Sequence, residues 1–154
     1  MIAVLQRVHS ASVIADGEPA GRIDKGLFIL LGVLEEDTEE DARLLAEKIA
    51  KLRIFSDEND KMNLSVVDIG GGALVVSNFT LAANYAKGNR PDYLRAAPPA
   101  VADPLYQRFS ELLRERVGTV ENGVFGAHMD ITVAANGPVT IVMDSAVLRK
   151  GGRA

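Results

Sequence analysis

The chain has 154 residues, of which 47% are hydrophobic and 25% charged, and its formal net charge is −4. These values are typical of one soluble globular domain and disfavour broad contact with a nucleic-acid backbone, because proteins that coat nucleic acid are usually basic. No apolar run reaches the ~18 residues that span a bilayer, and no secretory signal is recognisable. The absence of cysteine excludes disulfides and thiol nucleophiles. We therefore expect a cytoplasmic protein with no membrane association.

Strands are predicted first, followed by a clearly bounded helix. Residues 1–8 are apolar-rich, residues 10–16 alternate, and residues 26–34 form a continuous apolar run, which is typical of a strand buried on both faces. A helix is expected after Thr38, since Asp41 stands three residues later in the manner of a capping box and apolar residues then recur at helical spacing.

The middle of the chain predicts a buried strand, a long loop and a second helix. Gly70-Gly71-Gly72 precedes the apolar strand 73–77, so it indicates a turn and not a phosphate-binding loop. Residues 82–104 are rich in Ala, Pro, Gly and Asn, and loops of this length are usually functional or mobile. The second helix is expected to start with Asp103 as N-cap and Pro104 in the first position.

This inventory predicts an α+β protein with a largely antiparallel, barrel-like β-sheet and two main helices. We expect a single domain over residues 1–145. The basic segment 146–154 is expected to be a flexible tail.

Two short segments are candidates for function. Ser77, Asn78 and Thr80 cluster with Phe79 where a buried strand ends, and hydroxyls and free backbone N–H groups at such a point can polarise a carbonyl. The alternative is a strand end with local turn hydrogen bonds. The second segment, "ANGPVT" at 135–140, predicts a hairpin turn between two closing strands, although its proline has no N–H for a ladder.

Other chemistries find little support. The two histidines, His9 and His128, stand in no zinc-ligand pattern, and no G-x-S-x-G motif marks a nucleophile. We therefore expect no metal and no cofactor.

"SNFTLAA" at 77–83 and "NGPVT" at 136–140 together resemble the two signature motifs of the D-aminoacyl-tRNA deacylases. The similarity extends in order and spacing over residues 1–144, including "VLQRVHSASV" and "LRIFSDENDKMNLSV". Position 78 is Asn where the family usually has Gln, so the contact of this amide with a substrate is expected to shift.

The resemblance implies a homodimer that hydrolyses the ester between a D-amino acid and tRNA, and that also removes glycine mischarged on tRNA-Ala. It implies a cis peptide between Gly137 and Pro138 that acts as a chirality filter and reaches into the partner's active site. Asn136 belongs to the same motif. Arg7 is expected to brace this turn, with a surface ion pair as the alternative.

The resemblance places catalysis at Ser77, Phe79 and Thr80. We expect backbone N–H groups around Phe79 and Thr80 to polarise the ester carbonyl. The Thr80 hydroxyl orients water or acts as a nucleophile, but no base is evident beside it, so the ribose 2′-hydroxyl is the favoured assistant. Phe79 either stacks on the adenine or simply packs, and packing is favoured.

Two groups of basic residues are candidates for contact with tRNA phosphates. They are Lys87, Arg90 and Arg95 in the long loop, and Arg149, Lys150 and Arg153 in the tail. In both groups the alternative is a set of ordinary solubilising charges. The alternative to the whole interpretation is a non-catalytic dimeric binder of a small molecule or an RNA 3′ end.

Overall fold

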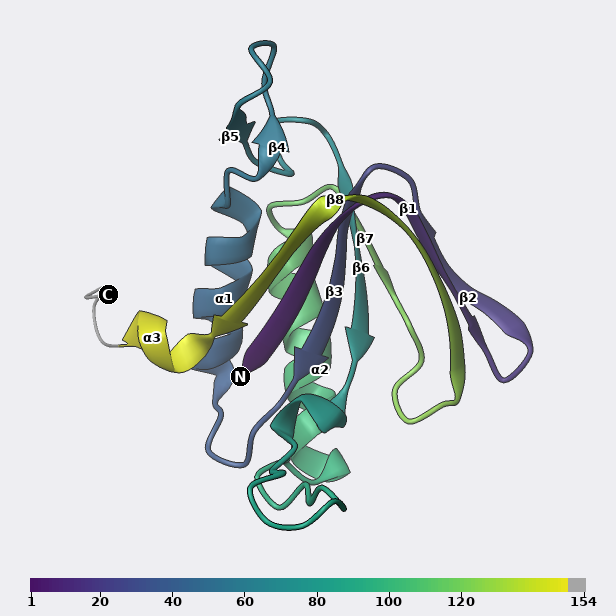
Figure 1. Ribbon diagram of the computed structural model, residues 1–154, viewed down its shortest axis with the longest axis vertical. Helices are drawn as coiled ribbons and strands as arrows, with labels where there is room; N and C mark the ends of the chain where they lie inside the picture. The colour runs from purple at the N-terminus through teal and green to yellow at the C-terminus, as the bar shows by residue number, and fades with distance from the viewer. Residues whose placement is uncertain (150–154) are drawn as a thin grey trace.

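A strongly bent six-stranded sheet organises the protein, and two long helices lie side by side against one of its faces (Figure 1). The computed structural model describes residues 1–149. In chain order the elements are β1 (Ile2–Ala15), β2 (Glu18–Ile23), β3 (Gly26–Gly32), α1 (Glu39–Lys51), β4 (Phe55–Ser56), β5 (Met62–Leu64), β6 (Gly72–Ser77), the 3₁₀ helix η1 (Phe79–Ala82), α2 (Pro99–Arg114), β7 (Thr119–Asn122), β8 (Met129–Asp144) and α3 (Ser145–Arg149).

The sheet runs in the order β2-β1-β3-β6-β7, with β8 on the other side of β1. The strand β1 pairs antiparallel with β2, β3 and β8, whereas β6 pairs parallel with both β3 and β7. The α+β architecture is as predicted, and the sheet is mixed, with three antiparallel pairings and two parallel ones. The parallel pairs arise because α1 and α2 serve as crossovers between β3, β6 and β7, an arrangement that parallel pairing requires.

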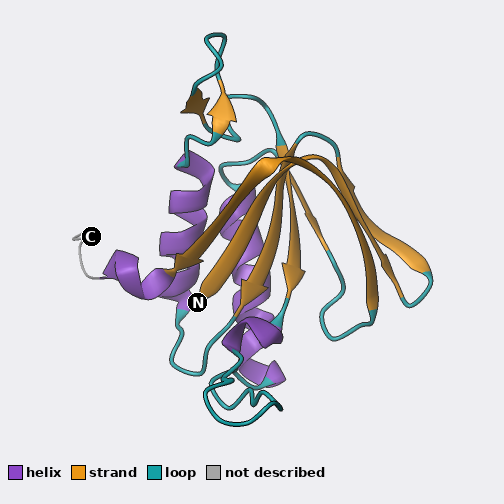
Figure 2. Cartoon of the chain, viewed as in Figure 1, coloured by secondary structure: helices purple, strands orange, loops and turns teal. Residues whose placement is uncertain are grey.

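The sheet curls until its edges approach each other, as the bent strands of Figure 2 show. The strand β2 returns to contact β6 and β7. A Cβ at Gly21 would lie 2.8 Å from the carbonyl oxygen of Asn122, so the close approach of β2 to β7 depends on glycine at this position. The barrel-like prediction agrees with this nearly closed shape.

Two apolar clusters fill the space on the two sides of the sheet. The larger lies between the sheet and the helices and includes Leu5, Ile29, Leu45 and Phe109. The smaller fills the inside of the curl, where Phe28 is among the buried residues. Burial of both sheet faces explains why 26–34 is a continuous apolar run.

The first helix begins as predicted, since the Asp41 carboxylate accepts a hydrogen bond from the Thr38 backbone N–H at 2.9 Å. The predicted start of the second helix is wrong. The helix α2 begins at Pro99 after Pro98, and Pro104 lies inside it. Pro104 has no N–H to donate to the carbonyl of Ala100, four residues earlier. The helix tolerates this loss because Ala100 lies in the exposed first turn.

The predicted hairpin at residues 136–138 is also wrong. The strand β8 runs through this segment and stays antiparallel to β1 on both sides of it. The chain does not reverse there because β1 is long enough to pair with both halves of β8.

The predicted flexible tail is corrected for residues 146–149, which form most of α3. Arg149 contacts the buried carboxylates of Asp37 and Asp41, and Asp37 also accepts a hydrogen bond from the amino group of Met1. Lys150 and Arg153 lie outside the described residues. Among residues 1–149, no helix is long and apolar enough to cross a membrane.

Candidate active site

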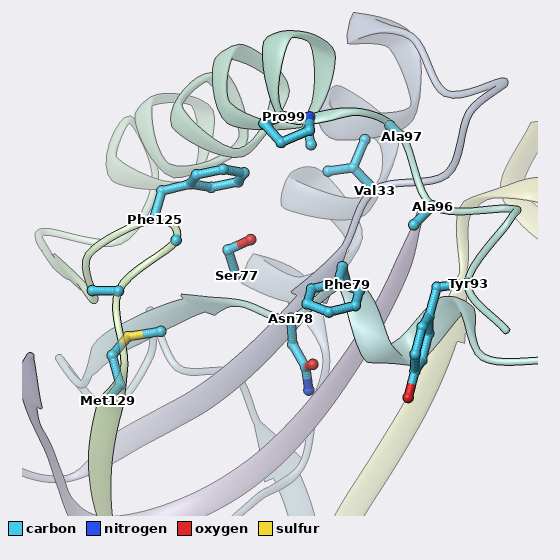
Figure 3. A pocket seen from close by; sticks show the side chains of 13 residues that line it. Val33, Ser77, Asn78, Phe79, Tyr93, Ala96, Ala97, Pro99, Phe125 and Met129 are labelled. Carbon is cyan, nitrogen blue, oxygen red and sulfur yellow. The ribbon is translucent and has the colours of Figure 1, made fainter. Parts of the chain in front are cut away.

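A pocket of about 490 Å³ opens where β6 ends and η1 begins (Figure 3). Four further segments complete its wall: the residue after β3, the end of the long loop, the first turn of α2, and the connection from β7 to the start of β8. The lining residues are Val33, Ser77, Asn78, Phe79, Tyr93, Ala96, Ala97, Pro99, Ala102, Phe125, Gly126, Ala127 and Met129. The wall is therefore mostly apolar, with Ser77 and Asn78 as polar groups at its floor.

Ser77 is the last residue of β6, a strand that has parallel neighbours on both sides over residues 72–75 and continues beside β3 as far as Ser77. Ser77 pairs with Leu31 of β3, and the Asn78 backbone N–H donates to the Leu31 carbonyl at 2.9 Å. From α2, the Tyr106 hydroxyl donates to the Val75 carbonyl at 2.8 Å. Burial raises the pKa of Tyr106, so this hydroxyl remains protonated and continues to donate.

The Ser77 hydroxyl points into the middle of the pocket (Figure 3). Within residues 1–149 it has no hydrogen-bond partner, and the backbone N–H of Phe79 also lacks an acceptor. Two unused donors beside an apolar cavity are the arrangement that stabilises a developing oxyanion.

Asn78 is the N-cap of η1 and occupies the donors of Thr80. Its Oδ1 accepts a hydrogen bond from the Thr80 backbone N–H at 3.2 Å and another from the Thr80 hydroxyl. The expected contribution of the Thr80 N–H to carbonyl polarisation is therefore not available in this arrangement, and the donor that remains is the Phe79 N–H.

Phe79 forms the rim of the pocket and not part of the core. Its side chain is 58% exposed and meets Tyr93 edge to face, with ring centroids 5.1 Å apart. Phe79 therefore packs against another aromatic ring at the pocket entrance and remains largely exposed there.

The second motif forms a bulge opposite Arg7. Gln6 pairs with Thr140 and Val8 with Ala135, so Arg7 alone faces residues 136–139 of β8. Its Nε donates to the Asn136 carbonyl at 2.8 Å, and one terminal nitrogen donates to the Ile54 carbonyl at 2.9 Å. The predicted brace is therefore present, and the alternative of a surface ion pair is wrong.

Gly137 and Pro138 lie at the exposed crest of this bulge, and the peptide bond between them is cis. A Cβ on Gly137 would lie 2.1 Å from the backbone nitrogen of Val139. No other residue fits this position without moving the backbone.

The structure does not bring the two motifs together within one chain. Along β1, Arg7 pairs with Leu27 at the start of β3, whereas Ser77 is paired with Leu31 near its end. Leu27 and Leu31 are four residues apart on β3, which corresponds to roughly 13 Å along the strand. The pocket and the bulge consequently lie toward opposite ends of the sheet (Figure 1).

The sequence interpretation missed much of the pocket wall, namely Phe125, Met129 and Pro99. Phe125 lies within the connection between β7 and β8, and Met129 directly follows that connection, in which Gly126 has a φ of +77°. That glycine was the one local signal of a structured loop. Of the basic candidates, Arg149 forms an internal ion pair, whereas Lys87, Arg90 and Arg95 are exposed.

Comparison with known proteins supports the resemblance. The family model described as D-Tyr-tRNA(Tyr) deacylase matches residues 4–144. A D-aminoacyl-tRNA deacylase from Chloroflexus aurantiacus is 56% identical, with 100% of this chain and 96% of the relative covered. A D-aminoacyl-tRNA deacylase from Thermus aquaticus is 53% identical, with 94% of this chain and 95% of the relative covered.

Solved structures agree with the fold. A c-Myc DNA unwinding element binding protein is 41% identical, with a TM-score of 0.88 over 94% of this chain and 98% of the other. A probable eukaryotic D-amino acid tRNA deacylase has the same fold, with a TM-score of 0.80 at 17% identity over 92% of this chain and 97% of the other. The resemblance found in the two motifs is thus confirmed, and the chain belongs to the D-Tyr-tRNA(Tyr) deacylase family.

Proposed function

We propose that this protein hydrolyses the ester bond of D-aminoacyl-tRNA and releases free tRNA and the D-amino acid. The observation that carries the proposal is the pair of unused donors, the Ser77 hydroxyl and the Phe79 N–H, at the floor of a pocket in a chain of this family. Because the proposed substrate is tRNA, we also propose that the protein acts in the cytoplasm.

In the proposed reaction the two donors bind the carbonyl oxygen of the ester. As water attacks, negative charge develops on that oxygen, and fixed donors stabilise it more strongly than they stabilise the neutral ester. The leaving group is the ribose oxygen of the terminal adenosine, which takes up a proton as the ester bond breaks.

Among the described residues that line the pocket, none has a side chain that is a suitable general base. The lining contains no carboxylate, histidine or lysine, and the Thr80 hydroxyl already donates to Asn78. The neighbouring ribose 2′-hydroxyl is therefore the group that orients the attacking water. An aminoacyl ester is activated enough for positioning and oxyanion stabilisation to suffice.

Discrimination against L-amino acids is proposed to come from a second copy of the chain. The bulge at Gly137 and Pro138 is exposed, and Arg7 holds its backbone in place. In a homodimer, this crest forms a wall of the partner's pocket on the side of the substrate Cα where an L side chain would project. D-amino acids present only hydrogen to the wall, and glycine also fits, including glycine mischarged on tRNA-Ala.

The test is hydrolysis of D-tyrosyl-, L-tyrosyl- and glycyl-tRNA by the purified protein. The proposal predicts loss of the D-tyrosyl and glycyl esters while the L-tyrosyl ester stays intact. Loss of all three esters contradicts the chirality filter. Stability of all three contradicts hydrolysis altogether and favours a non-catalytic binder of a small molecule or an RNA 3′ end.

A further inference from the structure

We propose that the loop of residues 84–95, here called the basic loop, binds the single-stranded 3′ end of tRNA along its phosphate backbone and leads the terminal nucleotide into the pocket. The inference rests on the proposed function, since it assigns a docking surface to that substrate. It adds residues outside the two motifs.

The basic loop has a closed and well-bonded base. Asn84 and Asp92 exchange two backbone hydrogen bonds of 2.8 and 2.9 Å, and the Asn84 side-chain amide donates to the Asp92 carboxylate at 3.0 Å. The Asn84 side-chain oxygen accepts from the Ala86 N–H, and Asp92 accepts from the Leu94 N–H. The side chains of Asn84 and Asp92 are therefore both occupied by hydrogen bonds within the loop, and the residues between them form its tip.

Three cations of the basic loop have no internal partner. Within residues 1–149, Lys87, Arg90 and Arg95 form no hydrogen bond through their side chains and have no carboxylate within ion-pair distance. The other described arginines are all engaged, as Arg43 and Arg108 are with neighbouring glutamates. Unpaired cations on an otherwise acidic protein are suited to phosphate groups.

The same loop exposes two large apolar side chains. Tyr85 is 80% and Leu94 is 82% exposed, more than any other large hydrophobic residue in the described part of the chain. A tyrosine ring in this position offers a stacking platform for a base. A single RNA strand presents both kinds of group, a phosphate at every nucleotide and a planar base beside it.

The basic loop continues directly into the pocket. Tyr93 and Ala96 line the pocket, and Tyr93 meets Phe79 at its rim. The Glu35 N–H donates to the Arg95 carbonyl at 2.9 Å, which anchors this end of the loop. A strand bound along the loop therefore ends at the pocket entrance, where the ester has to lie.

The first experiment compares two substrates. The triple variant Lys87→Ala, Arg90→Ala, Arg95→Ala is assayed with D-tyrosyl-tRNA and with D-tyrosyl-adenosine, which has no phosphate. We expect the KM for the tRNA to rise about 10- to 100-fold, while hydrolysis of D-tyrosyl-adenosine is unchanged. The matched control Lys25→Ala, Lys48→Ala, Lys61→Ala removes the same charge from exposed positions outside the loop and should leave both activities unchanged.

The second experiment measures binding without hydrolysis. Fluorescence anisotropy with uncharged, labelled tRNA is recorded over a range of salt concentrations for the wild type and both triple variants. Three phosphate contacts to a single strand predict that the log–log salt slope of the loop variant is smaller by about 2. Tyr85→Ala should weaken binding, and Tyr85→Phe, which keeps the ring, should not.

The two experiments separate the inference from the proposed function. Loop-dependent binding by a protein that hydrolyses no ester supports the basic loop and contradicts the deacylase. Full hydrolysis of D-tyrosyl-tRNA with equal KM and equal salt slope in the loop variant overturns the basic loop and leaves the deacylase intact. Failure of the wild type to bind tRNA at any salt concentration also overturns the basic loop.

Discussion

Arg7 on β1 lies opposite the bulge of β8 and donates from Nε to the backbone carbonyl of Asn136 at 2.8 Å. The same guanidinium donates to the carbonyl of Ile54, at the entrance to the β4–β5 hairpin, at 2.9 Å. One side chain thus fixes the backbone just before Gly137 and ties it to another segment. A planar group with several donors is suited to this role, and a lysine ammonium is not.

Replacement of Arg7 tests this brace. Arg7→Ala leaves two partly buried carbonyls without their donor, so we expect the free energy of unfolding to fall by about 1–3 kcal/mol. We also expect hydrolysis of L-tyrosyl-tRNA to increase, since the wall loosens, and Arg7→Lys to restore little of the discrimination. Urea denaturation and the ratio of D- to L-tyrosyl-tRNA hydrolysis measure the two effects. Arg22→Ala, at an exposed position on β2, is the control; an unchanged ratio in Arg7→Ala would show that the brace has no part in chirality.

Thr80 distinguishes the two catalytic alternatives. Its hydroxyl donates to the Asn78 side chain, and none of the pocket-lining residues in the described part of the chain is a base that could activate it. Assistance by the 2′-hydroxyl therefore predicts that Thr80→Val lowers kcat for D-tyrosyl-tRNA by less than about tenfold. Single-turnover kinetics give the rate of the chemical step. Complete loss in a folded Thr80→Val protein would identify Thr80 as the nucleophile.

The junction between α1 and α3 predicts a pH dependence of stability. Burial acts to raise the pKa of the Asp41 carboxyl, but hydrogen bonds from Ser145, Thr38 and Arg149 outweigh burial and lower that pKa below its usual value. A carboxyl with a lowered pKa stabilises the fold above its unfolded pKa of about 4, and this contribution is lost as the pH falls through the folded value.

Asp41→Asn should therefore lower the free energy of unfolding at pH 7 by about 1–3 kcal/mol and flatten its decline below pH 4. Urea denaturation at a series of pH values measures this dependence. Asp24→Asn, at a position where the carboxylate is almost fully exposed, should leave the curve unchanged. An equally steep acid decline in Asp41→Asn would assign the dependence to other groups.

Elements whose signal is local were predicted well from the sequence. The helix α1 follows from the capping pair Thr38 and Asp41 and from its apolar period, and β3 and β6 follow from short apolar runs. These elements are determined by residues only a few positions apart, so they can be recognised from a short stretch of sequence. The strand end at Ser77 could be located as a candidate site for the same reason.

Features that depend on distant partners were predicted less well. Asn136-Gly137-Pro138 has the composition of a hairpin turn, and only the length of β1, more than 120 residues earlier in the chain, makes it a bulge within one strand. The parallel pairing of β6 depends on where α1 and α2 cross the sheet. The pocket wall combines five separate segments, so no single stretch could reveal Phe125 or Met129 as neighbours of Ser77.

In the proposed homodimer, the pocket of one chain and the Gly137–Pro138 wall of the other form one active site. The most direct test mixes a pocket variant, Ser77→Ala with Phe79→Ala, with a wall variant, Gly137→Val, after joint unfolding and refolding. Both parents should be nearly inactive on D-tyrosyl-tRNA, because the pocket variant lacks the Ser77 hydroxyl and the aromatic rim, and because a valine at position 137 forces the backbone of the crest to move and adds a side chain that would occupy the substrate's place in the partner's pocket. Random pairing makes half of the dimers mixed, each with one intact site, so we predict recovery to roughly a quarter of wild-type activity. Activity that stays at the level of the parents, with mixed dimers shown by mass spectrometry, would contradict the claim.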